Sequence, residues 1–504
     1  MKKLRTLILC GLLAFVLASC GGQGEEIQDY DYNYDYENGY TPEPEPDTTP
    51  AVLQYVMDRA HERRLGIIKP DYNVLMAMTH GRVPAPLPGG LWEQTQHGSL
   101  SLERALEDVE IFFQALYNAY AGFVYFGGNE VFLPIKDAVI YELTEQGDMI
   151  GANTLAQVLH SHLYPVINDR HFMLGNQFLG HDMLYFLPTQ NLKYKKTENG
   201  FINAETRLYL LEIYTQNIYE VMRLHGDVDG QLFYRPVLLS SRLPAPLVFT
   251  YEDGSIAEIS FRALTGLSMH TSLPSLTFHD GIPVVAVRTM GFDGHSGALN
   301  YRHAVRFLSF IDELRDEPVI IVDVRSNGGG NGLLPLRWLY ALTGEIVPSN
   351  YVGLQTRAFS PAAFDFNPEN IFQNPLGVAE QFSSLESFGE NYTLTNNHPD
   401  RLIEHDQKII VLTDRFTGSA AEAFVDLTTN MANTLIIGTP TTGVLAFDMT
   451  YPSLFLPNTG LRFGFGRTMF VWPEGHFAEG IGIEPDIWAA GDALAVALAL
   501  LAGE

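Results

Sequence analysis

The segment DRFTGSAAEAF, residues 414–424, contains a serine whose position allows two different roles. Ser419 follows the apolar run KIIVLTD and opens the amphipathic run AAEAFVDLTTN, so it lies where a predicted strand turns into a predicted helix. A serine at such a point commonly caps the helix. The position also suits a nucleophile, because the N-terminus of a helix stabilises a developing negative charge. A nucleophile, unlike a cap, needs a base that takes its proton.

A second segment has the composition of a loop that binds a negative charge. VIIVDVRSNGGGNG, residues 319–332, is a predicted buried strand that ends in three consecutive glycines. Backbone N–H groups of such glycines can point at a ligand, because no side chain shields them and unusual φ/ψ values are open to them. Alone, the run also fits a strand-to-helix turn that needs glycine only for its geometry. The Gly-Lys-Ser/Thr ending of a nucleotide P-loop is absent.

Taken together, these segments resemble the S41 family of serine peptidases, which comprises the C-terminal processing (tail-specific) and the tricorn-type peptidases. The resemblance covers about residues 281–490 and is carried, in the family's order, by VIIVDVRSNGGGN, VLTDRFTGSAAEAF, TLIIGTPTTG and FGFGRTMFVWPEGHFAEGIGIEPDI. PVINDRHF resembles a fifth segment upstream. The resemblance implies an α/β fold, the ClpP/crotonase-like ββα superhelix, and serine endopeptidase activity. It places Ser419 on the family's nucleophile.

The resemblance fails at the base of the processing branch. That branch uses a lysine about 25 residues after the serine, and here Val444 occupies the position. The last lysine of the chain is Lys408, so no downstream lysine can replace it. A Ser–Lys dyad of that type is therefore excluded.

The tricorn-type branch uses an upstream histidine and a glutamate near the C-terminus. By resemblance to its motifs, INDRHFML makes His171 the candidate base and FAEGIGIEPDI makes Glu479 the candidate orienting acid. His171 would take the proton of Ser419 and return it to the leaving amine, while a carboxylate stabilises the imidazolium. For the oxyanion we predict the backbone N–H groups of Gly329 and Ala420.

Each of these assignments has a rival in the sequence. The aspartate of the same motif, two residues before His171, is expected to hold the turn, although it could also serve as the acid. The histidines show no metal-ligand spacing such as His-Glu-x-x-His, so we predict no catalytic metal and no cofactor. The rivals are His476 as the base, Glu484 or Asp169 as the acid, and Gly328 or Gly330 as the oxyanion donor.

The first 20 residues, MKKLRTLILCGLLAFVLASC, are typical of a secretory signal, with early cations, a short apolar core and small residues at the end. The ending resembles a bacterial lipobox, which implies that Cys20 becomes the lipidated first residue of the mature protein. We therefore expect a protein of the bacterial cell envelope, extracytoplasmic and anchored to a membrane by lipid. The other cysteine, Cys10, lies inside the signal, so the folded part has no disulfide.

Composition divides the rest of the chain into five parts. After the signal we expect a disordered acidic tether rich in tyrosine and proline, because it has few aliphatic residues to bury. The processing branch carries a PDZ domain at the place where this chain has its β-rich segment. The glycine-rich, carboxylate-binding loop of a PDZ domain is not apparent in that segment. The parts are the tether 21–50, a helical N-terminal domain 51–165, a β-rich segment 166–280, the peptidase domain 281–490 and a C-terminal helix 491–504.

The formal net charge is −28, which makes nucleic acids and anionic lipid headgroups unsuitable direct partners. The leading prediction is a serine endopeptidase that hydrolyses unfolded or extended polypeptides in the cell envelope. The alternative is a catalytically inactive lipoprotein on the same fold that binds peptides or small molecules. A wall- or polysaccharide-binding role has only the tyrosine-rich tether in its favour. The sequence leaves the oligomeric state and the cleavage preference open.

Overall fold

The structure, a computed structural model, describes residues 99–264, 272–291, 299–356, 385–388, 392–395, 402–449, 451–472 and 479–502, together with scattered positions between 53 and 93. The chain divides into two units, residues 1–44 and 45–504, and every described residue belongs to the second. The predicted signal sequence, Cys20 and the predicted tether lie outside the described residues. None of the described helices is long and apolar enough to cross a membrane.

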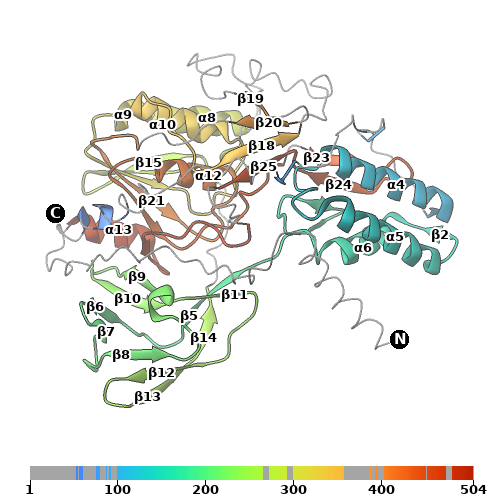
Figure 1. Cartoon of the computed structure of the whole chain (residues 1–504). Coiled ribbons are helices and arrows are strands. Elements are labelled where there is room, and N and C mark those ends of the chain that lie inside the picture. Colours follow the sequence, from blue (N-terminus) through green and yellow to red (C-terminus); the bar gives the residue numbers. More distant parts are fainter. Residues whose placement is uncertain are drawn as a thin grey trace. The chain divides into compact units, whose positions relative to one another are not determined.

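A ten-stranded sheet runs through the described part of the chain (Figure 1). From β16 to β26 the neighbouring strands are parallel, and β15 is an antiparallel strand at the edge. The nearly continuous valine, isoleucine and leucine runs of the parallel strands fit a sheet that is covered on both faces. The order is β15 (Ser275–His279), β16 (Ile282–Ala286), β17 (Val319–Asp323), β21 (Lys408–Thr413), β22 (Thr434–Gly438), β26 (Ile487–Trp488), β9 (Met222–Gly226), β10 (Leu232–Pro236), β6 (Tyr194–Thr197) and β7 (Gly200–Asn203).

Helices cover both faces of the parallel strands. Because side chains alternate along a strand, Ile320 and Val322 of β17 face one side and Ile321 faces the other. The first side packs against α8 (Leu299–Ser309), α9 (Ile311–Leu314), α10 (Leu333–Thr343) and α12 (Ala420–Thr428). The second side packs against α13 (Ala493–Ala502). The predicted α/β fold class is confirmed.

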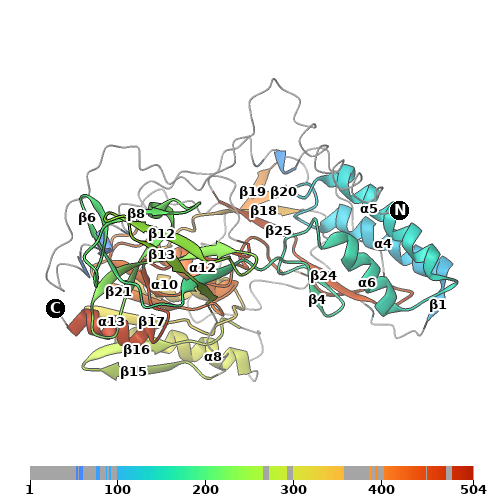
Figure 2. The ribbon, with the colours of Figure 1, turned by 90° about the horizontal axis from the view of Figure 1, so that it is seen from below.

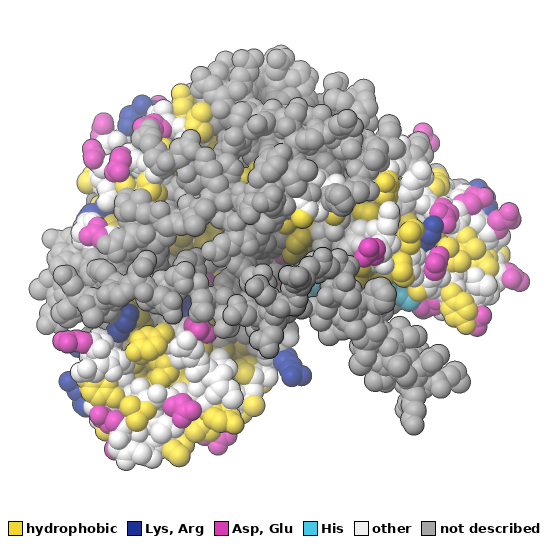
Figure 3. All heavy atoms as spheres, in the orientation of Figure 1, with side chains coloured by type: hydrophobic (Ala, Val, Ile, Leu, Met, Phe, Trp, Pro, Cys, Tyr) yellow, Lys and Arg dark blue, Asp and Glu magenta, His cyan; other side chains and the backbone are white. Residues whose placement is uncertain are grey.

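The β-rich segment continues the large sheet, since β9 pairs in parallel with β26 and places His225 opposite Trp488. Two three-stranded antiparallel sheets complete the segment, and its one described helix, α7 (Ile218–Val221), is a single turn. Hydrophobic side chains are exposed over this part of the molecule (Figure 3), among them those of Leu211 and Ile256. The two sheets are β11 (Leu238–Ser240), β5 (Leu184–Pro188) and β14 (Phe261–Ala263), and β13 (Ile256–Ile259), β12 (Leu247–Tyr251) and β8 (Leu210–Ile213).

The N-terminal helices α4 (Leu102–Ala119), α5 (Gly128–Gln146) and α6 (Ala152–Leu163) share a hydrophobic core with C-terminal strands. α4 buries Val109, Phe112 and Leu116 at the spacing of three and four that the sequence predicts. The Phe112 ring packs edge-on against Phe463 of β24 (Arg462–Phe465), 5.2 Å between centroids. Figures 1 and 2 show these helices beside β24. The predicted boundary at residue 165 therefore does not separate two cores.

Two four-stranded sheets connect this core to the rest of the second unit. One of them contains β3, which begins two residues after His171. Because β3 pairs with β24, this sheet links the segment of His171 to β24. The short strands β1 (Leu100–Ser101) and β2 (Met149–Ile150) pair with each other beside α4. The four-stranded sheets are β23 (Tyr451–Phe455), β24, β3 (Met173–Leu174) and β4 (Gln177–Phe178), and β19 (Leu385–Phe388), β20 (Tyr392–Thr395), β18 (Val352–Thr356) and β25 (Thr468–Val471).

Candidate active site

Ser419 lies at a sharp turn between β21 and α12. Its backbone has φ 52° and ψ −119°, a conformation that residues other than glycine rarely adopt. Strained backbone of this kind persists only where the surrounding structure enforces it, and it often marks functional sites. A serine on a strained strand-to-helix turn presents its hydroxyl away from the sheet, which is the geometry of a nucleophile elbow. Ser419 is partly exposed, although its neighbours Gly418 and Ala420 are buried.

Asp414 ties the serine turn to the glycine loop. Its buried carboxylate accepts hydrogen bonds from the backbone N–H of Phe416 within the turn and from that of Ser326 in the loop, both at 2.9 Å. The N–H of Gly418 donates to the backbone oxygen of Asn327 at 2.9 Å. The two segments that the sequence predicts as halves of one site are therefore in direct contact.

Gly329 lies against the nucleophile turn so closely that no side chain fits. A Cβ atom on Gly329 would lie 2.7 Å from the Cβ of Ser419 and 2.9 Å from the nitrogen of Ala420. Its φ of 103° also favours glycine. The N–H of Gly329, however, donates to Oδ1 of Asn327 at 3.0 Å. The N–H of Ala420 has no hydrogen-bond partner among the described residues, so it is the predicted oxyanion donor that is free in this structure.

A buried carboxylate that the sequence reasoning did not single out holds Ser419 from the other side. Oε2 of Glu422 accepts hydrogen bonds from the N–H of Ser419 at 2.9 Å and from the N–H of Val444 at 2.8 Å. Oε1 accepts from the hydroxyl of Thr441 and the N–H of Gly443. Burial raises the pKa of Glu422, and the four hydrogen bonds oppose this rise. The Ser-x-x-Glu spacing of a capping box could have revealed this residue.

Val444 occupies the lysine position of the processing branch and faces the nucleophile turn. A Cβ atom on Gly418 would lie 3.1 Å from Cγ2 of Val444. The side chain at position 444 therefore reaches the turn that carries Ser419, but as an aliphatic group it cannot accept a proton.

His171 lies in the turn between α6 and β3, and Asp169 holds this turn. Oδ1 of Asp169 accepts hydrogen bonds from the N–H of His171 at 2.8 Å and from the N–H of Phe172 at 3.1 Å. This is the turn-holding role expected for the aspartate. The buried imidazole forms a hydrogen bond with the backbone of Phe447, and its Nδ1 has no partner among the described residues. Burial lowers the pKa of His171 to about 4, so the ring is neutral at pH 7.

No hydrogen bond joins His171 to Ser419, although both lie in the described part of the chain. The stretch from Val444 to Phe447 runs from near one residue to near the other. At its start, the N–H of Val444 donates to the same Glu422 oxygen as the N–H of Ser419, and at its end the backbone of Phe447 forms a hydrogen bond with the imidazole. Three residues of extended chain span at most about 11 Å. The predicted nucleophile and base thus lie near the two ends of a short backbone stretch, and no hydrogen bond joins them in the structure.

Glu479 is buried and binds backbone groups, and its two oxygens make no hydrogen bond with the imidazole. Oε1 accepts from the N–H of Arg170 at 2.7 Å and Oε2 accepts from the N–H of Ala446 at 3.0 Å. Burial, reinforced by repulsion from Asp169, raises the pKa of Glu479 well above its ordinary value. Glu479 therefore joins the turn of His171 to the stretch between Val444 and Phe447.

The rival residues fall elsewhere. Both oxygens of Glu484 bind the guanidinium of Arg223 on β9, at 2.6 Å and 3.2 Å. His476 lies outside the described residues. Among the two glutamates, Glu479 is thus the one that is bonded to the turn of His171.

Residues 286–489 match the sequence model of peptidase family S41. This segment is an S41 peptidase domain. By family it makes the chain a serine-type peptidase, and it includes Ser419, Gly329, Ala420 and Glu479 but not His171. No curated protein sequence matches the chain.

Several solved structures are similar to the chain that contains the S41 domain. Mature CPAF complexed with lactacystin is 17% identical with a TM-score of 0.43, and covers 80% of this chain and 98% of its own. The photosystem II D1 C-terminal processing protease is 14% identical with a TM-score of 0.34, and covers 78% and 93%. A putative peptidase from Parabacteroides merdae is 15% identical with a TM-score of 0.37, and covers 80% and 97%. No residue assignment follows from these distant similarities.

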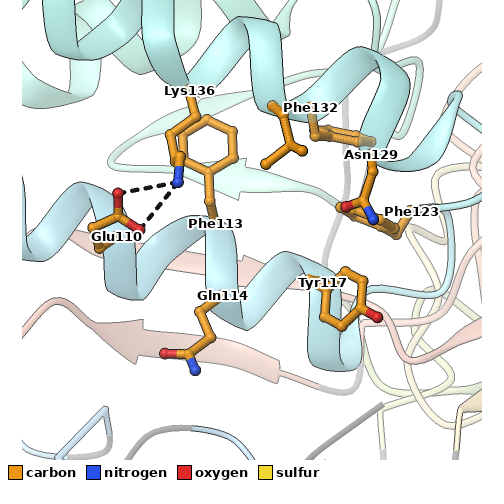
Figure 4. Close-up of a pocket in the computed structure, with 9 residues that line it drawn as sticks. Glu110, Phe113, Gln114, Tyr117, Phe123, Asn129, Phe132 and Lys136 are labelled. Carbon is orange, nitrogen blue, oxygen red and sulfur yellow. Dashed lines mark hydrogen bonds and ion pairs between the residues drawn. The ribbon is translucent and has the colours of Figure 1, made fainter. Parts of the chain in front are cut away.

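Other candidate binding features lie away from the S41 nucleophile. A cavity of about 330 Å³ between α4 and α5 is lined by Phe113, Phe123 and Phe132 and bordered by the ion pair of Lys136 with Glu110 (Figure 4). None of the predicted catalytic residues lines it. Within the described part of the chain, no group of three His, Cys, Asp or Glu side chains is arranged to hold a metal ion.

Proposed function

We propose that the protein is an endopeptidase that hydrolyses unfolded or extended polypeptides, with Ser419 as the nucleophile, His171 as the base and Glu479 as the orienting acid. The observation that carries the proposal is the nucleophile elbow. Ser419 has strained backbone angles, lies against a glycine that admits no side chain, and is followed by the unpartnered N–H of Ala420.

The chemistry requires two proton transfers and one tetrahedral intermediate in each half of the reaction. Ser419 Oγ adds to the peptide carbonyl carbon while the neutral imidazole of His171 takes its proton. The oxyanion accepts a hydrogen bond from the N–H of Ala420. It accepts a second one from the N–H of Gly329 after that N–H has broken its hydrogen bond with Asn327. The imidazolium then gives its proton to the leaving amine and the C–N bond breaks. Water repeats the sequence on the ester and releases the acid.

The proposal requires a local rearrangement before chemistry. A hydrogen bond from Ser419 to the His171 ring and one between the ring and Glu479 have to form, because the structure contains neither. His171 is neutral at pH 7 and can therefore accept a proton, although burial makes it a weaker base than an exposed histidine. Substrate binding is the event that we expect to drive this change.

A second reading is a catalytically inactive binding protein on the same fold. It is favoured by the absence of a hydrogen bond between His171 and Ser419 and by the engaged N–H of Gly329. Under this reading the arrangement in the structure is the final one, and no ligand assembles a triad.

Reaction with a fluorophosphonate serine probe separates the two readings. Attack by an activated Ser419 displaces fluoride and leaves a covalent phosphonyl group, which mass spectrometry locates. We expect labelling at Ser419 in the wild type, none in Ser419→Ala and at least a hundredfold slower labelling in His171→Ala. An unlabelled, folded wild type that also fails to cut an unfolded protein substrate would contradict the peptidase proposal and favour the binding reading.

We also propose that the protein is anchored in the bacterial cell envelope through a lipid on Cys20. The proposal comes from the lipobox-like ending of residues 1–20. Cys20→Ala should move the protein from the membrane fraction to the soluble fraction of the expressing cells. Retention of Cys20→Ala in the membrane fraction would contradict the anchor.

A further inference from the structure

Tyr120 connects the N-terminal helices to the turn that carries His171. It is the residue that ends α4, and it lies far outside the residues 286–489 that the family model covers. Its hydroxyl donates a hydrogen bond to Oδ2 of Asp169 at 3.0 Å, and the residue is fully buried. The other oxygen of Asp169 holds the N–H groups of His171 and Phe172.

The ring of Tyr120 is fixed by contacts with two aromatic residues, each of which is directly linked to His171. It packs edge-on against Phe172, the next residue after His171, with 5.1 Å between centroids. It also contacts Phe447 at 6.0 Å, and the backbone of Phe447 bonds the imidazole. The hydroxyl therefore meets Asp169 in one defined geometry, and little freedom remains for the ring.

The electrostatic surroundings make the Tyr120 hydroxyl important to Asp169. Burial raises the pKa of Asp169 to about 7, and the charge of Asp448 adds to this rise. Glu479 faces the same site, and repulsion from Asp169 adds to the rise in the pKa of Glu479 that burial causes. Among the described residues, Tyr120 is the one side chain that donates a hydrogen bond to Asp169. Burial raises the pKa of Tyr120 well above its ordinary value, so it remains a donor at neutral pH.

We propose that Tyr120 is a positioning residue for the peptidase reaction, which fixes the turn of His171 by donating a hydrogen bond to Asp169. The inference rests on the proposed function and extends it to a residue of the N-terminal helices. The imidazole has to approach Ser419 from a defined starting point, and misplacement of a catalytic group by about 1 Å can reduce a rate about a hundredfold. Without the hydroxyl, Oδ2 of Asp169 is buried with no donor, and the turn loses a fixed contact.

The test replaces a single oxygen atom. Tyr120→Phe keeps the aromatic contacts and removes the hydrogen bond to Asp169, and Tyr117→Phe, one turn earlier on α4, is the matched control. The rate of inactivation by a fluorophosphonate is measured against probe concentration, which separates the maximal rate from the affinity. In Tyr120→Phe we expect the maximal rate to fall about 10- to 100-fold with an affinity within about twofold of the wild type. Tyr117→Phe should match the wild type in both.

The pH profile adds a readout that a purely structural role would not move. The hydrogen bond from Tyr120 lowers the pKa of Asp169, so its loss raises that pKa further. If the ionised Asp169 holds the active turn, the acid limb of the inactivation rate should move to higher pH in Tyr120→Phe. A limb at an unchanged position, with an unchanged maximal rate, would overturn the inference.

A double-mutant cycle with Asp169→Asn shows whether Tyr120 acts through Asp169. If it does, adding Tyr120→Phe to Asp169→Asn should reduce the rate by less than about twofold. If the rate of the double variant falls by the product of the two single-variant factors, the inference is overturned, because Tyr120 then acts independently of Asp169. A wild type that is never labelled would instead overturn the proposed function, and this inference with it.

Discussion

Glu422 accepts a hydrogen bond from the backbone N–H of Ser419 at 2.9 Å, and the same oxygen accepts one from Val444 at 2.8 Å. One buried carboxylate therefore fixes both the nucleophile and the start of the stretch that leads to His171. It connects residues that are 25 positions apart and holds the strained conformation of Ser419 in place.

Glu422→Gln should destabilise the protein and reduce its reaction with a fluorophosphonate. A glutamine keeps the shape, but its NH₂ group would face backbone N–H donors where the carboxylate oxygen accepted them. A buried group left without its partner costs about 1–3 kcal/mol, so the free energy of unfolding should fall by about that amount in urea denaturation. The exposed Glu404→Gln is the control and should match the wild type. Equal stability of Glu422→Gln and the wild type would show that the carboxylate does not hold the turn.

Gly329→Ala should remove at least 99% of the peptidase activity. The new methyl group would lie 2.7 Å from the Cβ of Ser419 and 2.9 Å from the nitrogen of Ala420, and the φ of 103° disfavours alanine. Loss of one oxyanion donor typically reduces kcat about 100- to 1,000-fold. Gly332→Ala is the matched control, because a Cβ atom there has nothing within 4 Å. Turnover of an unfolded protein substrate measures both variants, and near wild-type turnover by Gly329→Ala would place the oxyanion site elsewhere.

The stability of the protein should depend on pH through His171. Its pKa of about 4 in the folded protein is below the ordinary value of 6.5, so the unfolded chain takes up the proton first. The contribution is therefore fully present above pH 6.5 and is lost as the pH falls towards 4, with a total of about 3 kcal/mol. Urea denaturation at pH 7 and pH 4.5 should show His171→Gln losing less stability between the two than the wild type. His162→Gln, at a partly exposed site, should behave as the wild type, and parallel losses in all three proteins would refute the assignment.

Val444→Lys should partly restore activity to His171→Ala. The side chain at position 444 already reaches the nucleophile turn, at 3.1 Å from the place of a Cβ on Gly418, and a lysine there could take the proton of Ser419. We expect fluorophosphonate labelling of the double variant about tenfold faster than that of His171→Ala, with a larger gain above pH 8 as the amine loses its proton. Val444→Met in the same background has a long side chain without an amine. If it labels as fast as the lysine variant, the gain does not come from a base.

The sequence was sufficient to predict the parts of the site that are local. Ser419, Gly329 and Ala420 are close together because two adjacent parallel strands end at the same edge of a sheet, and strand, glycine and helix patterns reveal such ends. The role of Asp169 in its turn was likewise visible, since an aspartate readily bonds N–H groups two residues on.

The other features of the site and the fold depend on contacts between residues far apart in the sequence, and hydrophobic periodicity carries no information about such contacts. Glu479 and Glu484 are five residues apart in one loop, and their distant partners distinguish them in the structure: Arg170 and Ala446 bind the first, and Arg223 binds the second. The junction between the N-terminal helices and β24 joins segments more than 300 residues apart, so composition suggested a boundary at residue 165 that the shared core does not respect. The absence of a hydrogen bond between His171 and Ser419 is also a tertiary feature that no motif reveals.

The pairing of β9 with β26 sets a limit on dissecting this protein. A fragment that begins at residue 281 would retain Ser419 but leave β26 with an open edge, and open edges of buried strands invite aggregation. It would also lack His171 and the helices that pack on β24. The stretch that sequence likeness picks out is thus smaller than the unit that one sheet and one core hold together, and an inactive or insoluble fragment would say nothing about the activity of the whole chain.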